Sequence, residues 1–128
     1  MATLTYLDTH VVAWLFAGRT DLLPKAIRQI VELEQLLISP MAELELQYLF
    51  ELGRTTEPAS IVVQTLERQI GLEKCTLPFG QVVTTALAET WTRDPFDRMI
   101  TAQARVRNSS LLTKDETILR HYEHALWA

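Results

Sequence analysis

Short apolar runs alternate with longer amphipathic stretches along this chain, a pattern typical of α/β proteins. Continuous apolar runs predict buried strands at 4–7, 36–38 and 110–113, with further strands expected at 72–77 and 125–127. The amphipathic stretches predict helices at 9–17, 24–33, 40–52, 58–70, 81–89, 95–106 and 115–121. Strands that are themselves apolar throughout, each followed by a helix, indicate a parallel sheet covered on both faces.

The helix boundaries carry recognisable signals. Ser39-Pro40 and Asp94-Pro95 each place a capping side chain before a proline, which is favoured at the first helical position. Gly18 and Gly53 follow the predicted ends of two helices, where glycine is common. These signals fix where the helices start, and in a parallel sheet the helices start near the carboxyl ends of the strands.

Length and composition favour one globular domain over residues 1–128. The 128 residues are 48% hydrophobic, enough for one buried core, and no proline- or glycine-rich linker divides them. No apolar run approaches the roughly 18–20 residues that a membrane span needs, and no secretory signal is visible. The single cysteine, Cys75, has no partner for an internal disulfide. We therefore expect a cytoplasmic protein with no membrane association.

The net charge of −4 argues against a generic nucleic-acid binder, which is usually basic. The charge is uneven, however. Residues 93–120 contain six lysines and arginines against four acids, a local excess of two positive charges. Such a run is most often a solvated helix face, but a basic rim beside an acidic pocket can also hold a polyanion.

Four acidic residues stand where strands end or helices begin: Asp8, Glu45, Asp97 and Asp115. Asp8 and Asp115 follow predicted strands, Asp97 lies in the first turn after Asp94-Pro95, and Glu45 lies within two turns of Ser39. In open α/β sheets ligands bind outside the carboxyl ends of the strands. If these carboxylates converge there, a divalent cation is the natural counter-charge, which points to metal-dependent phosphodiester chemistry.

Each acid also has a plainer interpretation. Asp8, Asp94 and Asp115 are favoured helix caps, and Asp97 gains from the helix dipole in a first turn. Glu45 lies at the margin of an apolar stripe formed by Met41, Leu44, Tyr48 and Leu52, whereas Glu43 points to the other side. We therefore expect Glu45 rather than Glu43 to face inward, where it needs either a metal or a buried arginine. The three histidines are interpreted as surface or capping residues.

These segments together resemble the PIN-domain ribonucleases, and among them the VapC-type toxins of bacterial toxin–antitoxin pairs. The resemblance covers nearly the whole chain. It rests on Leu7-Asp8-Thr9-His10, the spacing from Ser39 to Glu45, Leu112-Thr113-Lys114-Asp115 and, most specifically, Arg93-Asp94-Pro95-Phe96-Asp97-Arg98. Where similar chains often have a histidine before that last stretch, this one has Thr92.

The resemblance implies a three-layer α/β/α sandwich with a mostly parallel sheet of about five strands. It assigns Asp8, Glu45, Asp97 and Asp115 to a catalytic pocket that holds Mg²⁺ or Mn²⁺ and hydrolyses RNA. Thr9, Asp94 and Thr113 are then candidates to support the metal ligands, and Arg98 and Lys114 to contact RNA phosphates. The implied partners are an RNA substrate, a small antitoxin whose C-terminal segment blocks the pocket, and a second copy of the chain.

Other classes fit less well. A response-regulator receiver domain needs an aspartate after its third strand, and no aspartate occurs between Asp21 and Asp94. A haloacid-dehalogenase-type phosphatase needs Asp-x-Asp at the first strand, where residue 10 is His. Two alternatives stay open: a housekeeping RNA-processing nuclease without an antitoxin, and a PIN-like module that only binds a partner.

Overall fold

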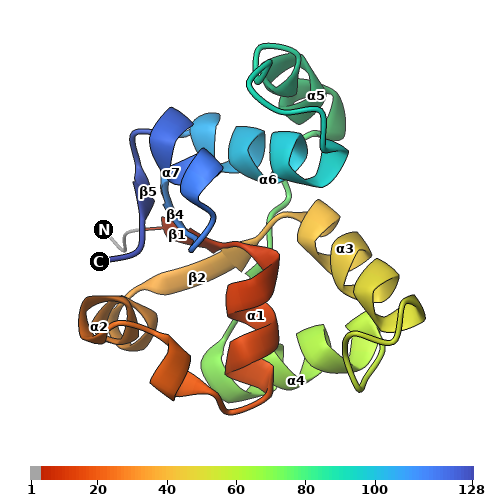
Figure 1. Cartoon of the computed structure of the whole chain (residues 1–128), viewed down its shortest axis with the longest axis vertical. Helices are drawn as coiled ribbons and strands as arrows, with labels where there is room; N and C mark the ends of the chain where they lie inside the picture. Colours follow the sequence, from red (N-terminus) through yellow and green to blue (C-terminus); the bar gives the residue numbers. More distant parts are fainter. Residues whose placement is uncertain (1–3) are drawn as a thin grey trace.

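Five parallel strands form the centre of the molecule, in the order β3-β2-β1-β4-β5 (Figure 1). The computed structural model describes residues 4–128; residues 1–3, which the single-domain prediction includes, lie outside the described part. The strands are β1 (Leu4–Leu7), β2 (Gln35–Ile38), β3 (Glu73–Lys74), β4 (Ser110–Leu112) and β5 (Ala125–Leu126). The predicted parallel sheet is confirmed.

The three central strands are apolar because both of their faces are covered. Leu7, Ile38 and Leu112 are completely buried, and most of the other residues of β1, β2 and β4 are also buried. Burying one such side chain contributes about 1.5–3 kcal/mol relative to leaving it exposed. The core therefore lies along the middle of the sheet and fixes the positions at which these strands end.

Helices cover both faces of the sheet, as the predicted α/β/α sandwich requires. In Figure 1, α1, α2 and α4 lie below the sheet and α6 and α7 above it. Helix α3 contacts α1 and α4 on one side and α6 on the other, and α5 packs on α6. The helices are α1 (Thr9–Phe16), α2 (Lys25–Leu33), α3 (Pro40–Glu51), α4 (Ala59–Ile70), α5 (Phe79–Ala86), α6 (Pro95–Arg105) and α7 (Glu116–His121).

Two element predictions need correction, and one short element was not predicted. The strand expected at 72–77 is only Glu73–Lys74, both exposed, and the helix expected at 81–89 runs from Phe79 to Ala86. A 3₁₀ turn, Thr20–Leu22, joins α1 to α2. At the edge of the sheet, Leu72 and Cys75 are buried without belonging to the strand. The apolar residues at these positions therefore suggested a longer strand than the pairing with β2 supports.

Capping side chains start the helices that leave the carboxyl ends of the strands. Ser39 accepts the backbone N–H of Met41 at the start of α3, and Asp94 accepts those of Phe96 and Asp97 at the start of α6. Asp115 accepts the N–H groups of Thr117 and Ile118 at the start of α7. The capping roles expected for Ser39, Asp94 and Asp115 are confirmed, and they hold this edge of the sheet in place.

Candidate active site

Asp8 is anchored at the junction of β1 and β4. The two strands pair with Leu7 opposite Leu112, so the residues that follow them, Asp8 and Thr113, are neighbours. Thr113 donates its hydroxyl to Asp8 Oδ2 at 2.7 Å, and the backbone N–H of Thr9 donates to Asp8 Oδ1 at 2.8 Å. Asp8 is only 4% exposed. These two donors hold the buried carboxylate of Asp8 in one orientation.

Glu45 approaches the same point from α3. The Thr9 hydroxyl donates to Glu45 Oε1 at 2.5 Å, which joins α3 to the first residue of α1. Glu43 instead lies 3.6 Å from the ammonium group of Lys74 beside β3. Thr9 therefore contacts two of the four acids, donating its backbone N–H to Asp8 and its hydroxyl to Glu45. Thr113 likewise contacts a second acid, because its hydroxyl accepts the N–H of Asp115 at 3.0 Å.

Asp97 lies in the first turn of α6 and faces the other acids. Its pKa is raised to about 7, first by burial and then by the charges of Asp94, Asp8, Asp115 and Glu45. Burial also raises the pKa of Glu45, with further repulsion from Asp8 and Asp94 that the bond from Thr9 partly offsets. Within residues 4–128, the carboxylate of Asp97 has no hydrogen-bond or ion-pair partner. The fold therefore concentrates negative charge here, and among the described residues no cation pairs with Asp97.

The donor set suits a hard divalent cation, although its side chains do not form a closed cage. All four acids offer carboxylate oxygens, the ligands that Mg²⁺ and Mn²⁺ prefer. Among the residues that the structure describes, however, no three His, Cys, Asp or Glu side chains converge closely enough to hold an ion directly. Asp8 and Asp115 instead direct oxygens at local N–H and hydroxyl donors. Magnesium usually keeps several waters, so carboxylates spaced in this way fit a hydrated ion better than a dehydrated one.

His10 makes contacts that its sequence position did not predict. Its Nε2 accepts the backbone N–H of Lys114 at 2.9 Å, so that nitrogen carries no proton and the ring is neutral. Its Nδ1 lies 3.6 Å from Asp8 Oδ2. Burial lowers the pKa of His10, although Asp8 and Asp115 act in the opposite direction. The ring ties the start of α1 to the β4–α7 loop through this hydrogen bond, while the His10 side chain remains 30% exposed.

The two cations proposed as RNA contacts occupy different places. The guanidinium group of Arg98 donates hydrogen bonds to the carbonyl oxygens of Ala86 and Leu87, and so caps the C-terminal end of α5. It therefore holds α5 against α6 and does not face the acids. Lys114 is exposed, and its Nζ lies 5.9 Å from the centre of the Trp14 ring. Of the two residues, only Lys114 stands beside the acidic site.

Comparison with known proteins identifies the family. The PIN domain family model matches residues 5–124, so the chain belongs to the PIN domain family. PIN domains are generally nucleases that use divalent metals. A search of curated protein sequences finds no significant match. Within residues 4–128, no helix is both long and apolar enough to cross a membrane.

Solved structures share the fold at low identity. VapBC-1 from nontypeable Haemophilus influenzae superposes with a TM-score of 0.65 and 17% identity, covering 98% of this chain and 97% of that one. VapBC2 from Rickettsia felis, solved with a DNA fragment from its promoter, gives 0.63 and 16%, covering 92% of each chain. A domain of a functionally unknown Methanocaldococcus jannaschii protein gives 0.56 and 21%, covering 99% and 91%. These comparisons confirm the PIN fold expected from the sequence.

The raised pKa of Asp97 predicts how stability depends on pH without divalent ions. Between the ordinary carboxyl range near pH 4 and about pH 7, the folded chain binds more protons at Asp97 than the unfolded chain does. The proton bound by Asp97 therefore adds to the free energy of unfolding. This contribution is fully present below about pH 4 and is lost as the pH rises through about 7. Chemical denaturation of wild type and Asp97→Asn in chelator, at pH 4.5 and pH 8, measures the free energy of unfolding of each protein. We expect Asp97→Asn to lose less stability over this interval, and equal losses would contradict the assignment.

Proposed function

We propose that this chain is a Mg²⁺- or Mn²⁺-dependent endoribonuclease and the toxin of a toxin–antitoxin pair, with residues 1–128 forming one nuclease domain. The observation that carries the proposal is Asp97: a half-buried carboxylate repelled by four others, with its pKa raised to about 7. Such an arrangement costs stability, and a bound cation would recover it. PIN family membership supports nuclease activity, and the VapBC structures with the same fold support the toxin role.

In this proposal each acid has a stated task. Asp8 and Asp97 hold the ion, Glu45 orients the attacking water, and Asp115 completes the charge of the site. Thr9, Thr113 and His10 fix the carboxylates through the contacts described above, and Asp94 fixes the first turn of α6. When bound, the ion would activate water and offset the charge that grows on the phosphate.

The proposed reaction is the hydrolysis of an RNA phosphodiester. A bond forms between the water oxygen and phosphorus, and the bond from phosphorus to the 3′ oxygen breaks. One proton of the water leaves it as the new bond forms, and the departing 3′ oxygen takes up a proton. The products are a 3′-hydroxyl and a 5′-phosphate. Glu45 suits the water-orienting task because burial raises its pKa, which makes it a better proton acceptor than an ordinary exposed carboxylate.

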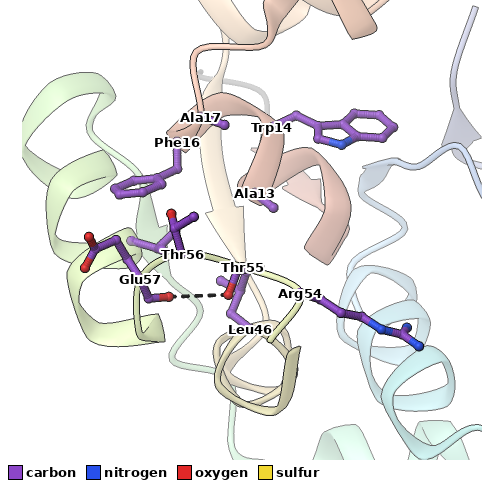
Figure 2. Close-up of a pocket in the computed structure, with 10 residues that line it drawn as sticks. Ala13, Trp14, Phe16, Ala17, Leu46, Arg54, Thr55, Thr56 and Glu57 are labelled. Atoms are coloured by element: carbon purple, nitrogen blue, oxygen red, sulfur yellow. Dashed lines mark hydrogen bonds between the residues drawn. The ribbon is translucent and has the colours of Figure 1, made fainter. Parts of the chain in front are cut away.

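An apolar cavity away from the acids supports an antitoxin partner. It has a volume of about 250 Å³ and lies between α1 and the α3–α4 connection (Figure 2). Ala13, Phe16, Leu46 and Val62 form much of its wall, while Arg54 and Glu57 add charge at the α3–α4 connection. A hydrophobic pocket with polar groups at its edge fits apolar side chains of an amphipathic peptide segment. We propose that the antitoxin docks here and continues toward the acidic site.

A second apolar surface supports a homodimer. Four apolar side chains are each at least half exposed: Leu44 and Tyr48 on α3, Phe79 on α5, and Leu87 directly after α5. Exposed apolar groups gathered in this way commonly mark a protein–protein interface. The surface adjoins a shallow cavity of about 130 Å³ that includes Met41, Leu44, Phe79 and Met99. The mass of the purified protein in solution tests this part of the proposal, and a monomer at high micromolar concentration would contradict it.

The direct test of the nuclease proposal is RNA cleavage by the purified protein. Total RNA and single-stranded oligonucleotides are incubated with Mg²⁺, with Mn²⁺ or with chelator, and the ends of the fragments are mapped. We expect discrete fragments with 5′-phosphates only when a divalent ion is present, because the acids alone repel the RNA phosphates. Fragments that persist in chelator would contradict the metal dependence. Intact RNA under all conditions, including toxic expression in cells, would favour a binding role.

A further inference from the structure

An aromatic cavity with a lysine at its edge adjoins the acidic site. His10, Trp14, Lys114, Asp115 and Glu116 line this open cavity, whose volume is about 400 Å³. The Trp14 and His10 rings meet edge to face with centroids 5.0 Å apart, and Trp127 lies 5.9 Å from Trp14 and 6.1 Å from His10. Trp14 and Trp127 pack against the core but are both partly exposed, and they form one cluster with His10.

Trp14 lines both this cavity and the apolar one described above. Figure 2 shows Trp14 and Phe16 leaving α1 on opposite sides, with the indole ring of Trp14 turned toward the C-terminal segment. His10 and Trp127 hold this ring from the side. An indole ring fixed in this way presents a rigid aromatic surface at the wall of an open cavity, which is the feature that proteins use to stack nucleobases.

The cavity is continuous with the proposed site of hydrolysis. Asp115 belongs to both, and His10 contacts the cavity on one side and lies 3.6 Å from Asp8 on the other. Lys114 Nζ lies over the Trp14 ring, 5.9 Å from its centre. A base that stacks on this face takes the place of the ammonium group, and the long lysine side chain then reaches the phosphate of the same nucleotide. An aromatic face, an exposed cation and a neighbouring cluster of acids together match a nucleotide better than they match a peptide side chain.

We propose that this cavity is a nucleobase subsite, in which one base of single-stranded RNA next to the cleaved bond stacks on Trp14 while Lys114 pairs with its phosphate. This inference rests on the proposed nuclease function and adds how the substrate is recognised. Stacking accepts any base but requires that the base be unpaired. The subsite therefore selects loops and single-stranded segments over duplex RNA.

The fluorescence of Trp14 reports directly on this subsite. In the Trp91→Phe/Trp127→Phe variant, Trp14 is the one remaining tryptophan of the chain. The probes are a mixed-sequence, phosphorothioate-linked RNA octamer, which resists hydrolysis, and a base-free octamer with the same backbone, both in Mg²⁺. We expect the RNA to quench Trp14 emission and the base-free octamer to leave it unchanged. Equal effects of the two probes, or none, would overturn the subsite.

Substitutions then measure what stacking contributes. Trp14→Ala should raise the Kd for the octamer about tenfold, whereas Trp14→Phe should stay within about threefold of wild type because the phenyl ring still stacks. Trp91→Phe is the matched control, since Trp91 stacks on His121 away from this cavity. Thermal unfolding verifies that each variant is folded, and the quenching result decides the matter if Trp14→Ala is not. An unchanged Kd for a folded Trp14→Ala would overturn the proposal.

The two proposals fail in different ways. Metal-dependent RNA cleavage by wild type without quenching of Trp14 would leave the nuclease standing and remove the subsite. No cleavage with any metal would remove the nuclease, whatever Trp14 reports. If RNA leaves Trp14 unchanged, the RNA subsite is wrong even where a co-purified protein partner alters the emission, because Trp14 also lines the cavity proposed for the antitoxin.

Discussion

Asp97→Asn should reduce RNA cleavage by more than about a hundredfold while the protein stays folded. The substitution keeps the size of the side chain and removes one negative charge from the group that would hold the ion. Residues that merely support metal ligands already cost about 10- to 100-fold in affinity or activity when they are replaced. Cleavage of a single-stranded RNA in Mg²⁺ by purified wild type and variant measures the loss. Growth arrest and RNA fragmentation on induced expression should disappear together.

Stability separates this loss from misfolding. Burial and four neighbouring carboxylates make ionised Asp97 unfavourable in the absence of metal, so Asp97→Asn should unfold at or above the wild-type temperature in chelator at pH 8. Asp21→Asn is the matched control, because Asp21 is exposed and pairs only with Arg19. A folded Asp97→Asn protein that cleaves RNA as wild type does would contradict the catalytic assignment. So would equal losses in both variants.

Much of the fold follows from local patterns that the structure obeys. The apolar runs at 4–7, 36–38 and 110–113 became buried parallel strands because a sheet covered on both faces leaves no polar side to alternate with. Ser39-Pro40 and Asp94-Pro95 marked the first turns of α3 and α6 because a cap and a proline are both favoured there. Where the local sequence strongly favours one kind of secondary structure, the element can be predicted from it.

Helix α3 shows where such patterns stop working. The stripe of Met41, Leu44, Tyr48 and Leu52 suggested its buried face, but the last three are at least half exposed, and Ala42 and Leu46 are the buried residues. Apolar residues occur all around this helix, so a helical wheel cannot say which of its faces meets the core and which remains available for a partner. Glu45 contacts Thr9 because it neighbours Leu46, not because it borders that stripe.

The contacts that position the acids could not be read from the sequence. Strand register places Thr113 against Asp8 across 105 positions, and the packing of α1 on the β4–α7 loop places His10 against Lys114. The positive charge of Arg98 suggested an RNA contact, but its guanidinium group donates a hydrogen bond to a backbone carbonyl oxygen at the end of α5. Each acid at a strand end can be recognised from its local sequence. The residues that support it cannot, because they depend on which elements pack together.

A buried glutamate shows the same limit and leads to the second large expected effect. Glu89 is 2% exposed, follows α5, and accepts hydrogen bonds from the guanidinium group of Arg105 on α6 and, at 2.5 Å, from Trp91 Nε1. Arg105 also lies 4.8 Å from the Tyr122 ring centre and donates to the carbonyl oxygen of His121. This group of residues connects the α5–α6 loop, which leads to Asp94 and Asp97, to the end of α7.

Arg105→Ala should lower the free energy of unfolding by about 3 kcal/mol, because it leaves the Glu89 carboxylate buried without its counter-charge. The estimate is at the low end for a broken buried pair, since the Arg105 side chain is 32% exposed. For a chain of this length the melting temperature should fall by roughly 10 °C.

Arg19→Ala is the matched control: its pair with Asp21 is exposed on both sides, so removing it should leave the melting temperature nearly unchanged. Removing both charges with Arg105→Met/Glu89→Gln should recover part of the loss, as expected when the cost comes from the unpaired carboxylate. Equal melting temperatures for Arg105→Ala and Arg19→Ala would show that this buried pair does not hold the α5–α6 loop.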